Sequence, residues 1–224
     1  MEQILAEQSL QSCTDNTRSL LNQITQDILQ KGYSIQTNAL PNELADMLHF
    51  HITQMPNEKF NEAGIGRELN QQVNEKVRND EIAWINGESP AGASWLNWTT
   101  DIQTFLNRRL FLGLFSFESH FAVYEKGHFY KRHLDAFKGD TNRVLSLVTY
   151  LNKDWQPGDG GELVIYRDEN DTQGIKVEPK FGTVVIFLSE EFEHEVLPAN
   201  TQRLSIAGWF RVNNSIANNI DPPR

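Results

Sequence analysis

Hydrophobic residues follow a helical period in the first half of the chain. Apolar side chains recur three or four residues apart with polar residues between them, which is typical of helices that bury one face. The first predicted helix carries the periodic residues Leu20, Leu21, Ile24, Ile28 and Leu29. A second helix can begin at Pro41, because proline suits the first helical turn, and a third spans residues 94–110. Between the first two helices, residues 33–36 alternate like a short strand.

From about residue 117 the pattern changes to a period of two, which is typical of β-strands. Turn-forming Gly, Pro, Asn and Asp residues separate the candidate strands. These strands cover residues 119–125, 129–135, 143–151, 161–166, 174–178, 183–188, 193–197 and 203–212. Eight short antiparallel strands after a helical start predict an α+β fold. Its core would be a double-stranded β-helix (jelly-roll), with the N-terminal helices packed on one sheet.

Composition and charge indicate how many domains to expect, which partners are unsuitable and which compartment fits the protein. The 224 residues suffice for one domain with a sizeable core, and no linker-like stretch divides them. The net charge of −10 argues against nucleic acid as the main partner, because its phosphates would repel an acidic surface. Cys13 is the single cysteine, so no internal disulfide can form. No apolar run reaches the ~20 residues of a membrane span, and Met1 opens no signal-peptide pattern. We therefore expect a soluble cytoplasmic protein without a membrane partner.

A candidate metal site begins with His133 and Asp135, which lie two residues apart in one predicted strand. Side chains alternate along a strand, so both point to the same face and can reach one divalent ion. His194 follows His133 by 61 residues, in another predicted strand, and can supply a third ligand. Two histidines and a carboxylate on one side of a metal leave open positions opposite, as in non-haem iron(II) oxygenases. The same set also suits zinc, and each residue by itself is common in purely structural positions.

Arg203 opens the last predicted strand, nine residues after His194. One face of this strand carries Arg203, Ser205, Ala207 and Trp209, and the other carries Leu204, Ile206, Phe210 and Val212. Small side chains beside an arginine leave space for a ligand, and a guanidinium binds a carboxylate through two parallel hydrogen bonds. Next to a metal cluster, this pattern favours a carboxylate co-substrate such as 2-oxoglutarate over a surface salt bridge.

Several short motifs stand out in the second half of the chain. They are YKRHLD at 130–135, YLNKDW at 150–155, GGEL at 160–163, EPKF at 178–181, HEVLPA at 194–199 and Arg203. Together they make residues 121–212 resemble the 2-oxoglutarate- and Fe(II)-dependent prolyl 4-hydroxylases, in particular the oxygen-sensing (HIF-type) enzymes and their bacterial relatives. YLNKDW is the most specific of these motifs, whereas the others are shared more widely.

The resemblance implies a role for individual residues around the metal. His133, Asp135 and His194 would bind Fe(II), and Arg203 would pair with the distal carboxylate of 2-oxoglutarate. The residues expected to complete the co-substrate pocket are Tyr150, which would assist Arg203, and Tyr124, which would line the same pocket.

The resemblance also implies where the substrate lies. Tyr130 and Trp209 match residues beside the target proline, and Arg143 matches one that contacts the substrate chain. Two departures concern the pocket: Ala207 stands where the animal enzymes carry a polar residue, and the segment from Tyr124 to His133 is one residue shorter.

An upstream segment resembles the mobile loop that covers the substrate in that family. It contains GIG at 64–66 and the pattern R-x-D-x-I-x-W at 78–84. We therefore expect one domain over residues 1–224. Residues 1–116 would form helical support and a substrate-covering loop at about 60–94, residues 117–212 the oxygenase core, and residues 213–224 a tail.

The function implied by the resemblance is hydroxylation of a prolyl residue in a protein or peptide. Fe(II), 2-oxoglutarate and O2 would be required, ascorbate would keep the iron reduced, and succinate and CO2 would be released. Alternatives are an oxygenase that acts on another residue or on a small molecule, a zinc hydrolase, and a non-catalytic jelly-roll that senses a metal or ligand. The complete set of His133, Asp135, His194 and Arg203 argues against the last two.

Overall fold

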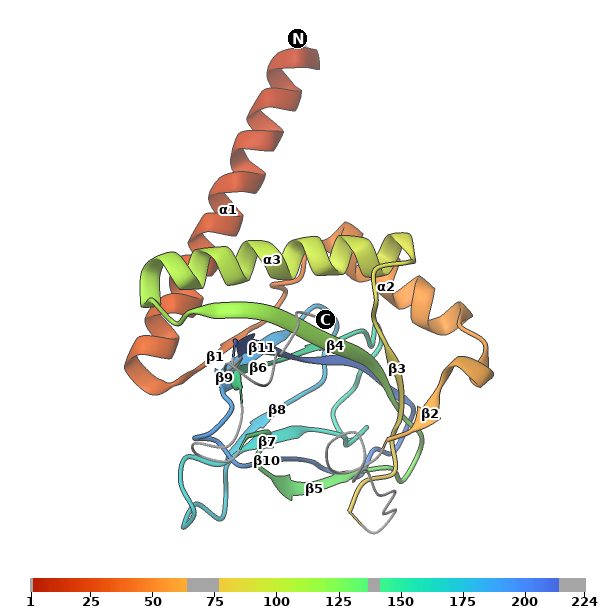
Figure 1. Ribbon diagram of the computed structural model, residues 1–224. Coiled ribbons are helices and arrows are strands. Elements are labelled where there is room, and N and C mark those ends of the chain that lie inside the picture. The colour runs from red at the N-terminus through yellow and green to blue at the C-terminus, as the bar shows by residue number, and fades with distance from the viewer. Residues whose placement is uncertain (1, 64–76, 137–141, 214–224) are drawn as a thin grey trace, which may run out of the picture.

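The chain folds into two antiparallel sheets that face each other, and most of their strands come from its period-two half (Figure 1). The computed structural model describes residues 2–63, 77–136 and 142–213, with side chains from residue 16 onward. A sheet of seven strands has the order β1-β9-β6-β11-β4-β3-β2, and a sheet of four strands has the order β5-β10-β7-β8. Two sheets in this arrangement form the jelly-roll core that the sequence predicts.

The strands of the large sheet come from both halves of the chain. Their bounds are β1 Tyr33–Gln36, β2 Asn61–Glu62, β3 Glu81–Trp84, β4 Leu114–Tyr124, β6 Arg143–Tyr150, β9 Val184–Leu188 and β11 Arg203–Val212. The strands of the small sheet are β5 Tyr130–His133, β7 Leu163–Ile165, β8 Ile175–Val177 and β10 His194–Val196. All eight strands predicted from residue 117 onward are confirmed, although most are one to three residues shorter and β4 begins earlier.

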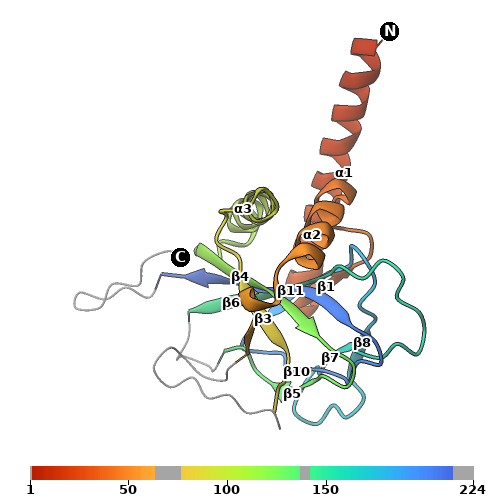
Figure 2. The same ribbon diagram turned by 90° about the vertical axis from the view of Figure 1, so that its right-hand side faces the viewer.

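Three helices cover the side of the large sheet that faces away from the small one (Figures 1 and 2). They are α1 Glu2–Lys31, α2 Asn42–Gln54 and α3 Pro90–Leu110, and a short 3-10 helix spans Asn57–Lys59. The third helix begins four residues before its predicted start, because the Ser89 hydroxyl caps the Gly92 backbone N–H and Pro90 fits the first turn. Among the described residues, no helix is long and apolar enough to span a bilayer.

Alternation along the strands produces two separate cores. On β4, Phe121 packs in the core between the large sheet and the helices, whereas Ala122 packs between the two sheets. Ile186 and Phe187 divide in the same way on β9. The helix-side core also takes Ile24, Leu48, Trp95 and Phe210, all at most 1% exposed. The helices therefore pack against one face of the large sheet, and the face towards the small sheet can line a site.

The expected covering loop at 60–94 is corrected in part. Residues 81–84 form β3, which pairs with β4, and α3 occupies the end of the segment from residue 90. Ile82 and Ala83 are buried, so this part is a strand of the sheet wall rather than a loop. The GIG motif at 64–66 and the tail beyond residue 213 lie outside the described residues.

Candidate metal centre and adjoining cavity

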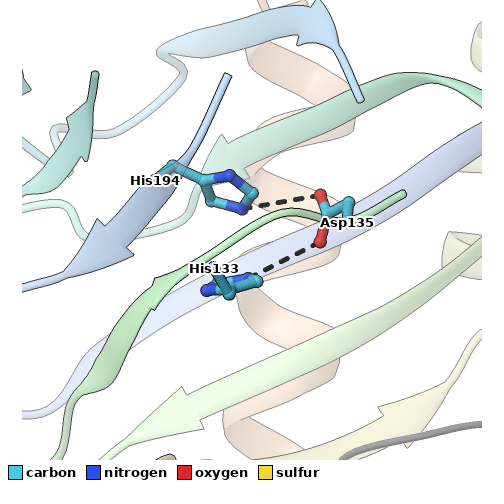
Figure 3. A group of neighbouring side chains, drawn as sticks. All are labelled: His133, Asp135 and His194. Atoms are coloured by element: carbon cyan, nitrogen blue, oxygen red, sulfur yellow. Dashed lines mark ion pairs between the residues drawn. The ribbon is translucent and has the colours of Figure 1, made fainter. Parts of the chain in front are cut away.

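Three side chains meet between the two sheets, and all belong to the predicted metal set (Figure 3). β5 and β10 pair antiparallel with His194 directly opposite His133, which brings the two histidines together across 61 residues of sequence. The ligand atoms of His133, Asp135 and His194 all lie within 4.8 Å of one another. A single divalent ion fits between atoms at these distances.

Asp135 reaches this site by a different route from the one that the sequence suggested. β5 ends at His133, and Asp135 lies in a bend beyond it rather than in the same strand. Its two carboxylate oxygens nevertheless face the two histidines. Oδ1 lies 3.6 Å from His133 Nε2, and Oδ2 lies 3.5 Å from His194 Nε2. The expected convergence is confirmed, but the bend and not strand alternation produces it.

Hydrogen bonds to the main chain orient both imidazoles for metal binding. The His133 Nδ1 lies 2.7 Å from the carbonyl of Lys131, and the His194 Nδ1 lies 3.1 Å from the carbonyl of Phe192. A carbonyl can only accept, so each Nδ1 carries a proton and donates it, and each Nε2 faces Asp135. Such outer bonds typically fix the tautomer of metal-binding histidines.

Charge at the cluster also suits a divalent ion. Burial lowers the pKa of His194 to about 4, which keeps its ring neutral at physiological pH. Burial opposes ionisation of Asp135, but the neighbouring His194 and His133 and a hydrogen bond from Ser146 hold its pKa well below the usual range. Two imidazoles and one carboxylate thus converge in a largely buried site, and these residues fit an Fe(II) ion.

A cavity of about 170 Å³ adjoins the three ligands, with Arg203 on its wall. Arg203 is 1% exposed and lies on β11 opposite Tyr124 of β4. Its Nε donates to the Gly161 carbonyl (2.9 Å) and one terminal nitrogen donates to the Ser205 hydroxyl (2.9 Å). Within residues 16–63, 77–136 and 142–213, no carboxylate forms an ion pair with it. A buried guanidinium without an acidic partner is costly, so this side chain fits the carboxylate of a bound ligand.

Tyr124 and Tyr150 flank this arginine, as the resemblance implied. The guanidinium carbon lies 4.8 Å from the ring centre of Tyr124 and 5.1 Å from that of Tyr150. Burial raises the pKa of Tyr150 to about 12, against the opposing effect of the Arg203 charge, so the phenol stays protonated. The Tyr150 hydroxyl is buried without a well-formed hydrogen bond to any described group. Both tyrosine rings therefore lie beside the guanidinium, and the Tyr150 hydroxyl keeps a proton that it can donate.

The expected substrate residues also line the cavity. The Tyr130 ring stacks on the His133 ring, with centres 3.6 Å apart and planes 17° apart. The Arg143 guanidinium lies 3.7 Å from the ring centre of Trp209 and pairs with Glu118 at 2.8 Å. The Trp209 indole N–H is buried and has no partner among the described residues. Two aromatic walls thus stand beside the metal ligands.

Three contributors to the site carried no clear signal of their own in the sequence. The Ser146 hydroxyl bonds to Asp135, and a serine in a strand pattern does not announce such a contact. Arg78 and Asp80 were expected in a mobile loop, but Arg78 lines the cavity and forms an ion pair with Asp80 through two hydrogen bonds of 2.7 and 2.8 Å. The Arg78 guanidinium also lies 4.3 Å from the Tyr130 ring centre, so it supports the ring that stacks on His133.

Comparison with known proteins agrees with this geometry. The family model described as "2OG-Fe(II) oxygenase superfamily" matches residues 119–211. A Pseudomonas putida prolyl-4-hydroxylase structure shares 41% identity and a TM-score of 0.77, covering 86% of this chain and 99% of that chain. A Trichoplax adhaerens prolyl hydroxylase, solved with a hypoxia inducible factor peptide fragment, shares 27% identity and a TM-score of 0.74, covering 89% and 92%.

Curated relatives are longer than this chain. The human protein Egl nine homolog 1 is 31% identical over 143 residues, which is 60% of this chain and 33% of that protein. This chain thus spans about a third of the length of that relative. The bacterial structure, by contrast, is matched over nearly its whole length. The range that the family model matches, residues 119–211, contains His133, Asp135, His194 and Arg203. The chain therefore belongs to the 2OG-Fe(II) oxygenase superfamily, and within it is similar to the prolyl 4-hydroxylases.

Proposed function

We propose that this protein is an Fe(II)- and 2-oxoglutarate-dependent dioxygenase that hydroxylates a prolyl residue in a protein or peptide. The observation that carries the proposal is the pairing of two features in one cavity. One is a cluster of two imidazoles and a carboxylate, and the other is the buried Arg203, which lacks an acidic partner in the described part of the chain. A zinc hydrolase would need the first feature but has no use for the second.

His133, Asp135 and His194 would hold the iron on one side only and leave the cavity side open. Bound Fe(II), together with O2 and 2-oxoglutarate, supplies the oxidation, in which 2-oxoglutarate becomes succinate and CO2 and one oxygen atom enters the substrate. The protein residues bind and orient the reactants. They also exclude bulk water, since His194 is 6% exposed and lies beneath the cavity.

Arg203 would bind the distal carboxylate of 2-oxoglutarate through guanidinium hydrogens that its bonds to Gly161 and Ser205 leave free. The Tyr150 hydroxyl would donate to the same carboxylate, which explains a buried phenol without a well-formed hydrogen bond. Tyr124 would close the pocket with its ring. These roles give the co-substrate one orientation, with its other end towards the metal ligands.

A proline ring suits the space between Tyr130 and Trp209, because both present aromatic surface beside the metal cluster. The Trp209 N–H would donate to a peptide carbonyl of the substrate. Arg143 would contact the substrate chain at the same wall. The names of the relatives support a peptide substrate, because one of them was solved with a peptide fragment bound.

Further expectations rest on the sequence and on the resemblance to the prolyl 4-hydroxylases. Ascorbate would keep the iron reduced between turnovers. The cytoplasm would be the working compartment, and the segment at 60–94 would include a part that covers the substrate.

The test is a turnover assay with the purified chain, Fe(II), 2-oxoglutarate and O2. Succinate is measured together with the gain of one oxygen atom on a set of proline-containing proteins and on free amino acids. We expect hydroxylated proline in a protein, in step with succinate. Hydroxylation of free amino acids alone would assign a small-molecule oxygenase. No succinate under any condition would assign a ligand-binding protein without this activity.

A further inference from the structure

The carboxylate ligand is held differently from the two histidine ligands. His133 and His194 are each oriented by a main-chain carbonyl two residues earlier in the same segment of chain. Asp135 lies in a bend outside any strand, so no ladder of backbone bonds fixes its position. Among the described residues, one hydrogen bond from outside the ligand set reaches its oxygens, and its donor lies on the opposite sheet.

That bond is donated by Ser146 of β6. The Ser146 hydroxyl lies 2.6 Å from Asp135 Oδ2, within the range of short bonds to ionised carboxylates. Ser146 is 1% exposed and lines the cavity beside the ligands. One bond thus ties the metal carboxylate to the large sheet.

The Ser146 hydroxyl is itself hydrogen-bonded to a second hydroxyl, that of Ser189. Ser189 Oγ lies 2.9 Å from Ser146 Oγ and is completely buried. Ser146 has a single hydroxyl hydrogen, and the carboxylate can only accept, so that hydrogen goes to Asp135. Ser189 must therefore donate to Ser146, and the bonds run in one direction, from Ser189 to Ser146 to Asp135. Hydrogen bonds arranged in such a chain strengthen one another.

We propose that Ser146 and Ser189 form a positioning relay that holds Asp135 Oδ2 and leaves Oδ1 as the oxygen that binds the metal. The relay anchors the bend to β6 and to the end of β9, where the Ser189 backbone N–H also bonds the Val144 carbonyl at 3.0 Å. The inference rests on the proposed function in one respect, namely that Asp135 binds a divalent metal. Neither serine was assigned a role by its sequence pattern.

The experiment compares metal affinity among variants of the full chain by titration with Mn(II), which needs no turnover. We expect Ser146→Ala to weaken Mn(II) binding about 10- to 100-fold, the usual range for loss of an outer-shell bond to a metal ligand. Ser146→Thr keeps the hydroxyl and should restore affinity to within about threefold of wild type. Ser189→Ala should weaken binding roughly 2- to 5-fold, because it acts only through Ser146.

Thr149→Val is the matched control. Thr149 is a completely buried hydroxyl in the same strand, and it bonds the Thr183 carbonyl at 2.9 Å. Its loss should reduce the stability of the fold to a similar degree as Ser146→Ala while leaving Mn(II) affinity unchanged. Urea unfolding of the metal-free variants measures that stability directly.

The outcomes separate two failures. If wild type does not bind Mn(II), the metal site itself is wrong, and the proposed function fails with it. If wild type binds but Ser146→Ala binds equally well, the relay is wrong while the proposed function stands. The relay is also wrong if Thr149→Val weakens binding as much as Ser146→Ala, because the effect would then follow from stability alone.

Discussion

The two sheets differ in how they are held together. The long strands of the large sheet, such as β4 and β11 with 11 and 10 residues, are buried against three helices by apolar side chains. The strands of the small sheet have only three or four residues. There, Arg132 of β5 forms an ion pair at 2.6 Å with Glu193, the residue before β10. Arg132 also donates to the carbonyls of Asp168 and Asp171 and lies 3.8 Å from the Tyr166 ring centre.

Because of this difference, the metal-binding part and the co-substrate part of the site lie on sheets that are stabilised in different ways. The histidine ligands belong to the small, polar-braced sheet, whereas Arg203 and its two tyrosines belong to the large, apolar-packed sheet. 2-Oxoglutarate would connect the two layers. Changes behind the large sheet should therefore alter stability, and changes on the small sheet should alter metal binding.

The largest effect is expected at the metal ligands. His133→Ala, Asp135→Ala and His194→Ala should each abolish succinate formation and weaken metal binding, because each removes one of three converging donors. Their fold should persist, as judged by circular dichroism. Wild-type 2-oxoglutarate decarboxylation in any one of these variants would remove that residue from the ligand set.

A change behind the large sheet should act on stability instead. Phe210 is completely buried, and its ring centre lies 4.5 Å from that of Phe117. Phe210→Ala should lower the free energy of unfolding by about 3–5 kcal/mol through lost burial and a cavity. Metal affinity of the molecules that remain folded should change little. If Phe210→Ala lowered metal affinity without lowering the free energy of unfolding, packing behind the large sheet would support metal binding rather than stability.

Arg203→Ala should raise the KM for 2-oxoglutarate while sparing metal affinity. Loss of a charge-assisted contact in a buried pocket costs on the order of 2–5 kcal/mol, because the carboxylate would then be buried without its partner. Arg203→Lys keeps the charge but not the forked geometry, and should recover only part of the affinity. An unchanged KM in Arg203→Ala would place the co-substrate elsewhere.

A lower pH should reduce the stability of the metal-free protein through two buried histidines, one on each sheet. Burial lowers the pKa of both His120 and His194 from 6.5 to about 4. As the pH falls from about 6.5 to about 4, the unfolded chain binds protons at both residues and the folded chain does not. The free energy of unfolding therefore decreases in that window, by up to about 3 kcal/mol per histidine.

Urea unfolding at pH 7 and pH 5 measures this effect, with His120→Gln as the variant that removes the contribution of the large sheet. The decrease between the two pH values should be smaller in His120→Gln than in wild type. An identical decrease in both proteins would mean that His120 titrates normally in the folded chain.

The smallest effect is expected at the brace of the small sheet. Arg132→Gln should weaken Mn(II) binding a few-fold, corresponding to about 1 kcal/mol, because its ion pair is partly exposed and screened by water. The free energy of unfolding should change by no more than a similar amount. A loss of stability as large as that of Phe210→Ala would show that apolar packing is not what distinguishes the two sheets.

The sequence predicted the strands and the convergence of the candidate site residues well because their signals are local or chemically specific. Alternation was strong enough to find every strand after residue 117, and His133, Asp135, His194 and Arg203 come together as expected. β3 was missed because Glu81–Trp84 does not alternate: the buried Ile82 and Ala83 lie side by side between two exposed residues. Its pairing with β4 is a tertiary contact that fixes the strand.

Other parts of the site could not be predicted, because they depend on which surfaces meet. Ser146 contacts Asp135 only after β6 has packed opposite the bend that follows β5. Likewise, Arg78 supports Tyr130 across an isolated bridge between distant segments. Neither contact follows from residue type or spacing, since a serine in a strand and an arginine near an aspartate are common everywhere.

The most direct test of the proposed site is an oxygen-free crystal structure of the full chain with Mn(II) and 2-oxoglutarate. We expect Mn(II) bound by His133, Asp135 and His194, and the distal carboxylate of 2-oxoglutarate on Arg203 beside Tyr150. Mn(II) bound at other residues, or a carboxylate that pairs with Arg143 or Arg78 instead, would contradict the assignment of this cavity as an Fe(II) and 2-oxoglutarate site.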